Sequence, residues 1–292
     1  MTVAPSQHGK GIALVVAAAV AWSTAPFFTR LLPFDSWTIL FWRGLFGAAM
    51  ISGILVLLQG WNGLRDFVRM DRYGWLVASL SALGMVCFIP SLQLTSVSNV
   101  AIIIATGPFM TAALAWIWLK EVPRLRTTLA SVVALVGIAI IVGGARPGAD
   151  ILGLALSVIM TLAIAVMTVV VRLHRNTSMV AAAALSNIIG SVVSMPFAQG
   201  IATVTVHDIV IFALFGFSQV ALGLTLYMLG SRLLPSGQAA LIATLETPLM
   251  PFWVWLAFQE TPAPRALIGG ALVMGAVIAD IIGDQREQKQ PA

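Results

Sequence analysis

The sequence predicts an all-α polytopic membrane protein, and three observations support this fold class. Apolar residues make up 59% of the 292 residues and charged residues only 9%, and the mean hydropathy is +0.98. Soluble domains usually carry about 25% charged residues. The apolar residues also form long runs, without the alternating polarity of a β-barrel strand. These runs are long enough for helices that cross a bilayer, which need roughly 20 residues each.

Ten membrane spans are expected, joined by short connections. They cover residues 11–32, 36–58, 73–94, 97–119, 125–144, 151–172, 178–197, 208–230, 236–258 and 264–283. We expect the first span to be retained and not removed as a signal peptide, because a later span matches it in an internal repeat. Residues 284–292 are polar and are predicted to form a cytoplasmic tail.

Two stretches of the chain are similar, Leu94–Glu121 and Leu233–Thr261. Each has a Thr and a Pro in mid-span, then Trp-rich apolar residues and a Glu, and 140 residues separate Pro108 from Pro248. The similarity predicts two repeats, residues 1–149 and 150–283. Because each repeat has five spans, an odd number, the two must cross the membrane in opposite directions. Inverted repeats are typical of secondary transporters, whose substrate site lies near the midplane.

Basic residues predict the orientation. If the N-terminus is cytoplasmic, the inside segments carry twelve Lys and Arg and the outside segments carry three, namely Arg30, Arg146 and Arg265. By the positive-inside rule, both termini are expected in the cytoplasm. The excess of 16 basic over 11 acidic residues therefore requires no nucleic-acid partner.

We expect no cofactor and no metal. The single cysteine, Cys87, excludes a disulfide framework and a multi-Cys metal site. The three histidines are too dispersed for a metal site, and no Gly-rich nucleotide-binding motif is present.

A family resemblance rests on Trp22-Ser23 near the end of the first span, Arg43 in the second, and the segment from Leu92 through Pro108 to Lys120-Glu121. With these residues the whole chain resembles the EamA branch of the drug/metabolite transporter (DMT) superfamily. Within the branch it is most similar to YddG-like exporters of aromatic and other amino acids in the bacterial inner membrane. The resemblance implies a basket of helices around a central cavity lined mainly by spans 1, 3, 4, 6, 8 and 9. The second repeat departs from the pattern, since Glu246-Thr247 directly precedes Pro248.

Prolines inside the spans are the first candidate site residues. Proline has no N–H, so the carbonyl four residues earlier loses its helical partner. Pro26, Pro90, Pro108 and Pro248 free the carbonyls of Trp22, Val86, Ile104 and Thr244 in this way. An unpaired carbonyl in hydrocarbon costs several kcal/mol unless it meets a partner or a wet cavity. These carbonyls could accept a ligand ammonium, or a neighbouring helix or a Thr hydroxyl could satisfy them.

Two ionisable residues lie well inside spans, away from their ends. Glu246 is ten residues into span nine, about 15 Å along the helix and so near the bilayer centre. An ionised side chain there costs roughly 2.5–3.5 kcal/mol on insertion scales, so Glu246 is expected to avoid lipid. It could carry a proton, accept the substrate amine, or form a structural hydrogen bond while protonated. Arg43 could reach the outer interface, pair with Glu246, meet a substrate carboxylate, or anchor span two.

Polar and aromatic side chains complete the candidates. Polar stripes are Ser157, Thr161 and Thr168 in span six, Asn99 and Thr106 in span four, and Gln219, Gly223 and Tyr227 in span eight, with Gln238 at the start of span nine. Such residues line cavities or join helices by hydrogen bonds. Trp22, Phe88, Trp116 and Tyr227 are candidate aromatic walls, whereas Trp37, Trp42, Trp253 and Trp255 fit an interfacial belt.

The sequence therefore predicts a secondary transporter that exports amino acids, aromatic ones included, as a monomer or weak oligomer in a lipid bilayer. The predicted substrate site comprises Trp22, Ser23, Phe88, Asn99, Thr106, Pro108, Thr161, Gln219, Tyr227, Gln238, Thr244, Glu246 and Pro248. An exporter of drugs, quaternary amines or nucleoside-like compounds would have a similar sequence, and a passive channel is a further alternative. An intramembrane enzyme would need a convergent nucleophile or metal set, and the sequence contains neither.

Overall fold

The computed structural model describes residues 5–60, 67, 70–120, 125–144, 147–174, 179–231, 233–234, 239 and 242–288. All regular structure within these residues is helical, which confirms the predicted all-α class. Eight helices in this part of the chain have the length and composition to cross a membrane, and they correspond to the first eight predicted spans. The ninth and tenth predicted spans fall on α14 (Glu246–Phe258) and α15 (Pro264–Gln288).

Several spans are interrupted. The first is divided into α1 (Pro5–Ser23) and α2 (Ala25–Leu31), and the fourth into α6 (Val97–Ala105) and α7 (Gly107–Leu119). The eighth consists of α11 (Val206–Gly216), the π-helical segment η4 (Phe217–Leu222) and α12 (Gly223–Ser231). The continuous helices are α3 (Ser36–Gln59), α5 (Arg72–Leu94), α8 (Leu125–Val142), α9 (Ala149–Leu173) and α10 (Met179–Ser194), and the short 3₁₀ turns are η2 (Met195–Phe197) and η3 (Ile201–Thr203).

Local chemistry explains where helices begin and end. Asp35 caps α3 by accepting the backbone N–H groups of Trp37 and Thr38, each at 3.0 Å, and Ser96 caps α6. Lys120 after α7 and Gln259 after α14 both have left-handed φ angles, 58° and 57°. These two positions are equivalent in the predicted repeats, and they are the non-glycine residues of positive φ in the described part of the chain.

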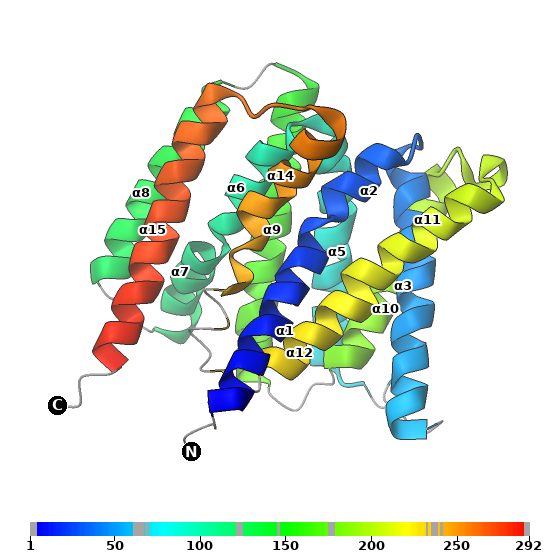
Figure 1. Ribbon diagram of the computed structural model, residues 1–292, viewed down its shortest axis with the longest axis horizontal. Coiled ribbons are helices and arrows are strands. Elements are labelled where there is room, and N and C mark those ends of the chain that lie inside the picture. Colours follow the sequence, from blue (N-terminus) through cyan, green and yellow to red (C-terminus); the bar gives the residue numbers. More distant parts are fainter. Residues whose placement is uncertain are drawn as a thin grey trace.

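Both termini lie at one end of the bundle, and the main buried cluster lies towards the other (Figure 1). This cluster joins α2, α3, α5, α6, α9, α11 and α14, and its largest members include Phe88, Phe212, Phe215 and Met250. Burial of so many apolar side chains from seven helices holds this end of the bundle together.

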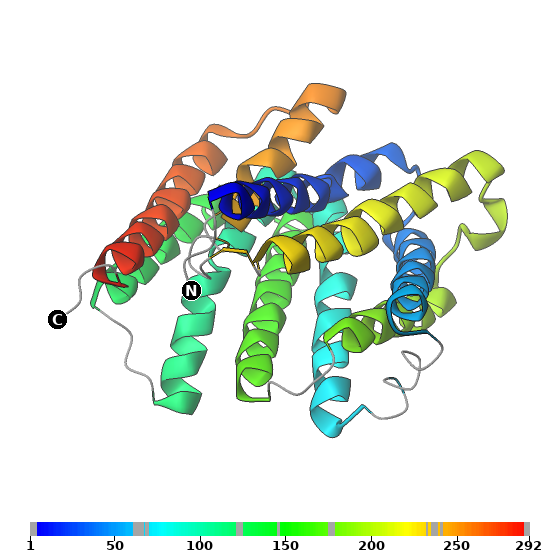
Figure 2. The ribbon, with the colours of Figure 1, turned by 60° about the horizontal axis from the view of Figure 1, so that its bottom comes forward.

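The helices associate in pairs. α5 packs along α9, α1 along α12, α3 against α10, and α8 against α15. The α8–α15 pair lies at one edge of the molecule in both ribbon views (Figures 1 and 2). The two helices approach closely at a pair of glycines. A Cβ atom added to Gly137 would lie 2.8 Å from the Gly269 carbonyl oxygen, and a Cβ atom added to Gly269 would lie 2.6 Å from the Gly137 carbonyl oxygen. Only glycine permits this approach of the two backbones.

The glycine contact leads to a stability prediction. Gly269→Val should force α15 away from α8 and lower the thermal stability of the purified protein, since overpacking costs about 1–3 kcal/mol. Gly275→Val is the matched control, because a Cβ atom at Gly275 on the same helix would meet nothing within 4 Å. Melting curves in detergent compare the two variants. Equal melting temperatures for both would contradict the close α8–α15 contact.

Asp35 leads to a prediction about pH. Partial burial raises the pKa of Asp35. Hydrogen bonds from the Thr38 hydroxyl and from the Thr38 and Trp37 backbone N–H groups lower the pKa by more than burial raises it, so the pKa lies below the ordinary 3.8. A lowered folded-state pKa stabilises the protein above about pH 4, and this stabilisation is lost as the pH falls through the folded-state pKa. Between pH 5 and pH 3, the melting temperature of Asp35→Asn should therefore fall less than that of wild type. An unchanged acid response would show that Asp35 does not contribute.

Candidate functional site

The break in the first span is closed by a side chain from the eighth. α1 ends at Ser23, and Pro26 leaves the carbonyl of Trp22 without its helical partner. The Gln219 side-chain amide donates to the Ala21 and Trp22 carbonyls, each at 2.7 Å, and lies 3.3 Å from the Thr24 hydroxyl. Gln219, predicted as a substrate contact, is buried and satisfies the backbone of the broken helix.

The same junction holds Trp22. Its indole N–H donates to the Gln219 backbone carbonyl at 3.0 Å, and its ring lies 5.2 Å from the ring of Tyr227. A Cβ atom on Gly223 would lie only 2.4 Å from the Trp22 nitrogen, so glycine is required there. Gln219, Gly223 and Tyr227 thus share one face, as the sequence predicts, and all three contact Trp22. Gln219 also lies in a π-helical segment, a feature that is frequent at functional sites.

The ninth span joins this junction through Trp253. Its indole N–H donates to the Ser23 hydroxyl at 2.8 Å, and the fully buried Ser23 donates in turn to the Val20 carbonyl at 2.8 Å. Sequence reasoning assigns Trp253 to the interfacial belt and misses this contact. One signal for it is present in the sequence: Trp253 follows Glu246 by seven residues, which places both on the same face of α14.

At the break in the fourth span, a hydroxyl bonds to the carbonyl of Ile103, which neighbours the Ile104 carbonyl that Pro108 frees. Thr106 lies between α6 and α7, is buried, and donates its hydroxyl to the Ile103 carbonyl at 2.6 Å. Thr161 of α9 is also buried and donates to the Ser157 carbonyl at 2.7 Å. Its methyl group would lie 3.6 Å from a Cβ atom added to Gly107. Thr106 and Thr161 therefore lie on two helices that meet at this break, and their hydroxyls bond to their own helices. Pro108 is exposed.

The break in the ninth span differs from the other two. The Thr244 carbonyl, predicted to be freed by Pro248, accepts the Thr247 N–H at 3.1 Å. Glu246 begins α14 and is partly exposed, and its carboxylate forms no hydrogen bond or ion pair with the described residues. A carboxylate at mid-span with no partner among the described residues can accept a proton or a cationic group from a ligand.

The remaining predicted residues lie apart from this junction. Phe88 is buried in the main apolar cluster, and Asn99 donates to the Thr95 hydroxyl at 3.2 Å near the start of α6. Gln238 lies outside the described residues.

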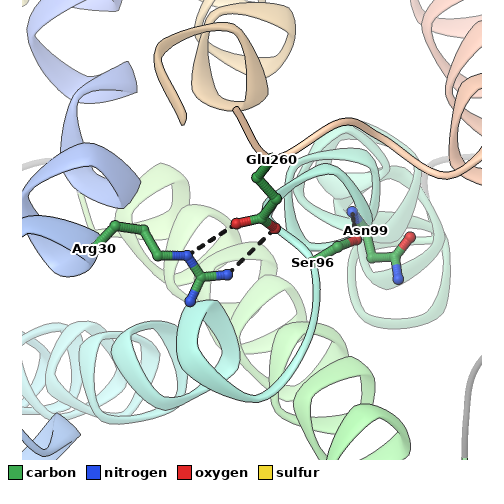
Figure 3. A network of polar contacts seen from close by, with 4 residues as sticks. All are labelled: Arg30, Ser96, Asn99 and Glu260. Atoms are coloured by element: carbon green, nitrogen blue, oxygen red, sulfur yellow. Dashed lines mark hydrogen bonds and ion pairs between the residues drawn. The ribbon is translucent and has the colours of Figure 1, made fainter. Parts of the chain in front are cut away.

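An ion pair joins the first and ninth spans at the end opposite the termini. Arg30 donates to both oxygens of Glu260, at 3.1 and 3.3 Å. Figure 3 shows this bidentate pair, with Ser96 and Asn99 at the start of α6 nearby. The geometry favours a stronger contact than a single surface ion pair gives. Together with the main apolar cluster, the pair holds this end of the bundle together.

Two apolar crevices occupy equivalent places in the repeats. One, of about 370 Å³, lies between α7 and α8 and is lined by residues that include Thr106, Trp116 and Leu135. The other, of about 420 Å³, lies between α14, α15 and α6 of the first repeat, and its lining includes Pro248, Trp255 and Met274. The two Trp residues are 139 positions apart, as are Leu135 and Met274. Each crevice therefore borders the broken helix of its own repeat.

The Gln219 contacts lead to a testable prediction. Gln219→Leu should leave the Ala21 and Trp22 carbonyls unpaired and lower the melting temperature, since a buried unpaired polar group costs about 1–3 kcal/mol. Gln199→Leu, at an exposed position in the α10–α11 connection, is the control. A Gln219→Leu protein that melts like wild type but has lost affinity for amino acids would instead identify Gln219 as a ligand contact.

Comparisons with known proteins agree with this arrangement. The EamA-like transporter family matches residues 9–143 and again residues 150–279, so the family domain occurs twice. No curated protein matches the sequence. Among the solved structures, 28 chains match. One crystal structure has 15% sequence identity and a TM-score of 0.63 over 96% of this chain and 99% of its own, and at that identity it shows the fold alone. The two family matches cover most of the chain, which therefore belongs to the EamA-like transporter family of the DMT superfamily, a family of multi-pass membrane transporters.

Proposed function

We propose that the protein is a secondary transporter that exports amino acids, aromatic ones included, across a bacterial inner membrane by alternating access. The observation that carries the amino-acid proposal is Glu246. Its carboxylate lies at the break of the ninth span, is partly exposed, and has no partner among the described residues. An ammonium group is the natural complement of such a carboxylate, because a charge-assisted hydrogen bond would compensate for its position in mid-membrane.

The architecture proposed for this function is ten spans in two inverted five-helix repeats around a central cavity. The helix pairs support it. α1 packs on α12, which pairs spans one and eight, and α9 packs on α5, which pairs spans six and three. Exchanging the two repeats converts one pair into the other. The α3–α10 contact joins spans two and seven, and the α8–α15 contact joins spans five and ten. Each of these contacts joins equivalent spans of the two repeats, as expected along the pseudo-twofold axis that relates inverted repeats.

Alternating access requires that one end of the bundle closes while the other opens. The Arg30–Glu260 pair and the main apolar cluster support a closed state at the end opposite the termini. With both termini cytoplasmic, as the basic residues favour, this is the outer end, and substrate would enter from the cytoplasm. Release to the outside would then require the Arg30–Glu260 pair to separate. The breaks near Pro26, Pro108 and Pro248 are the proposed hinges.

An exporter of drugs, quaternary amines or nucleoside-like compounds is the alternative that Glu246 also permits, because its carboxylate would attract any cation. Counterflow in proteoliposomes separates the two. Vesicles loaded with unlabelled compound are tested for accumulation of the labelled one, over a panel of amino acids and organic cations. Saturable exchange of amino acids supports the proposal. Exchange of cations with none of amino acids would refute it, and flux that does not saturate would indicate a channel.

Glu246→Gln provides the sharper test. It keeps the size of the side chain and removes its charge, so amino-acid exchange should fall about tenfold or more, since hydrogen bonds to charged groups contribute about 1.5–3 kcal/mol. If Glu246 also carries the coupling proton, the variant loses the pH dependence of uptake as well. Asp71→Asn, at the exposed cap of α5, is the matched control for loss of a carboxylate. Unchanged uptake and unchanged pH dependence in Glu246→Gln would leave it only a structural role.

A further inference from the structure

Arg43 is a second charged residue inside a span. It is the eighth residue of α3 and only 5% exposed, and the residues one turn before it, Ile39 and Leu40, are 0% and 2% exposed. Gly47, one turn after it, is buried as well. Arg43 therefore projects from the buried face of α3, which rules out a side chain that extends along the lipid-facing surface to reach water.

The contacts of Arg43 are aromatic. Its guanidinium carbon lies 5.1 Å from the ring centroid of Phe215 in α11, and Phe215 stacks on Phe28 of α2 at 5.1 Å and 15°. Arg43 forms no hydrogen bond or ion pair with the described residues, and its Nε is buried without a partner. At the same end of the bundle, Asp35 caps α3 and Glu260 pairs with Arg30. A cation–π contact alone compensates only part of the cost of placing a guanidinium in this environment.

A second donor without a partner lies beside it. The indole nitrogen of Trp42 is buried and unbonded. The Trp42 ring stacks on Phe212 at 6.3 Å, and Phe212 is one turn before Phe215 in α11. Two successive residues of α3 thus carry buried donors without partners, and both side chains contact aromatic rings of α11. Both donors match an anionic acceptor, and a planar guanidinium matches the two oxygens of a carboxylate.

We propose that Arg43 binds the carboxylate of the transported substrate, so that the transporter selects compounds carrying both an amine and a carboxylate. This inference rests on the proposed function and adds a second recognition group to it. Arg43 lies about 10 Å from the start of α3, whereas Glu246 lies about 18 Å from the end of α14, both measured from the end of the bundle opposite the termini. Arg43 is thus nearer the release side, and the substrate carboxylate meets it after the ammonium has met Glu246. The stacked rings of Phe28 and the fully buried Phe215 lie beside it.

An internal partner is the competing explanation. The side-chain oxygen of Asn187 in α10 is also buried and unbonded, and it would lie 2.7 Å from a Cβ atom on Gly47, one turn from Arg43. If Arg43 served only to join α3 to α10 through Asn187, removing either side chain would have the same effect on all substrates.

The test compares phenylalanine with phenethylamine, which has the same ring and amine and no carboxylate. Wild type, Arg43→Met, Arg43→Lys and Asn187→Leu are reconstituted, and each ligand is followed by counterflow and by the rise in melting temperature that it produces. Arg43→Met should raise the half-saturating concentration of phenylalanine at least tenfold and leave the response to phenethylamine unchanged. Arg43→Lys should recover part of the loss, and Asn187→Leu should keep the wild-type preference.

Three results would overturn the inference. One is an unchanged phenylalanine response in Arg43→Met. Another is an equal loss for both ligands in Arg43→Lys, the variant that retains the charge. The third is an Asn187→Leu protein with the same pattern as Arg43→Met. Failure of wild type to exchange any amino acid would instead refute the proposed function, so the two failures are distinguishable.

Discussion

Backbone polar groups in a membrane span must find partners within the protein, because hydrocarbon offers none. This constraint accounts for much of the structure at the helix breaks. Each proline that interrupts a span removes a donor, and polar groups near each break form hydrogen bonds to carbonyls there. The Gln219 amide bonds to the freed Trp22 carbonyl in the first span, and the Thr247 N–H bonds to the freed Thr244 carbonyl in the ninth. In the fourth span, the Thr106 hydroxyl bonds to the Ile103 carbonyl beside the break. Breaks satisfied in this way can persist near mid-membrane, where a transporter needs helices that bend.

The duplicated family domain explains why features recur at intervals of 139 or 140 residues. Lys120 and Gln259 end their helices in the same left-handed conformation, and the two apolar crevices adjoin equivalent helices. The copies have diverged at their breaks. Gly107 packs against Thr161 in the first copy, whereas the Glu246 carboxylate in the second has no partner among the described residues. A carboxylate at the break in one copy alone makes the two halves chemically unequal.

Many of the predicted site residues serve packing in the assembled bundle. Gln219, Thr106 and Thr161 are hydrogen-bonded within the protein, and Phe88 belongs to the apolar cluster. Sequence patterns show which face of a helix is polar, but a hydroxyl that bonds to its own helix and one that awaits a ligand have the same spacing. Two ionisable candidates, Glu246 and Arg43, form no hydrogen bond or ion pair with the described residues. Because a charge inside a span is costly, both stand out in the sequence.

The helical class, the first eight spans, the breaks near Pro26, Pro108 and Pro248 and the presence of two related halves can be predicted from the sequence, whereas α5 continues through Pro90 and the π-helical segment of the eighth span has no proline to predict it. They follow from hydropathy, proline chemistry and internal similarity, which act over a few residues or between matching segments. Which side chains meet depends on the tertiary structure. The contact of Trp22 with Gln219 joins residues 197 positions apart, and Trp253 reaches Ser23 across 230. Such pairings depend on the rotation and depth of each packed helix. Only the packed structure therefore distinguishes a polar side chain that has a partner within the protein from one that has none.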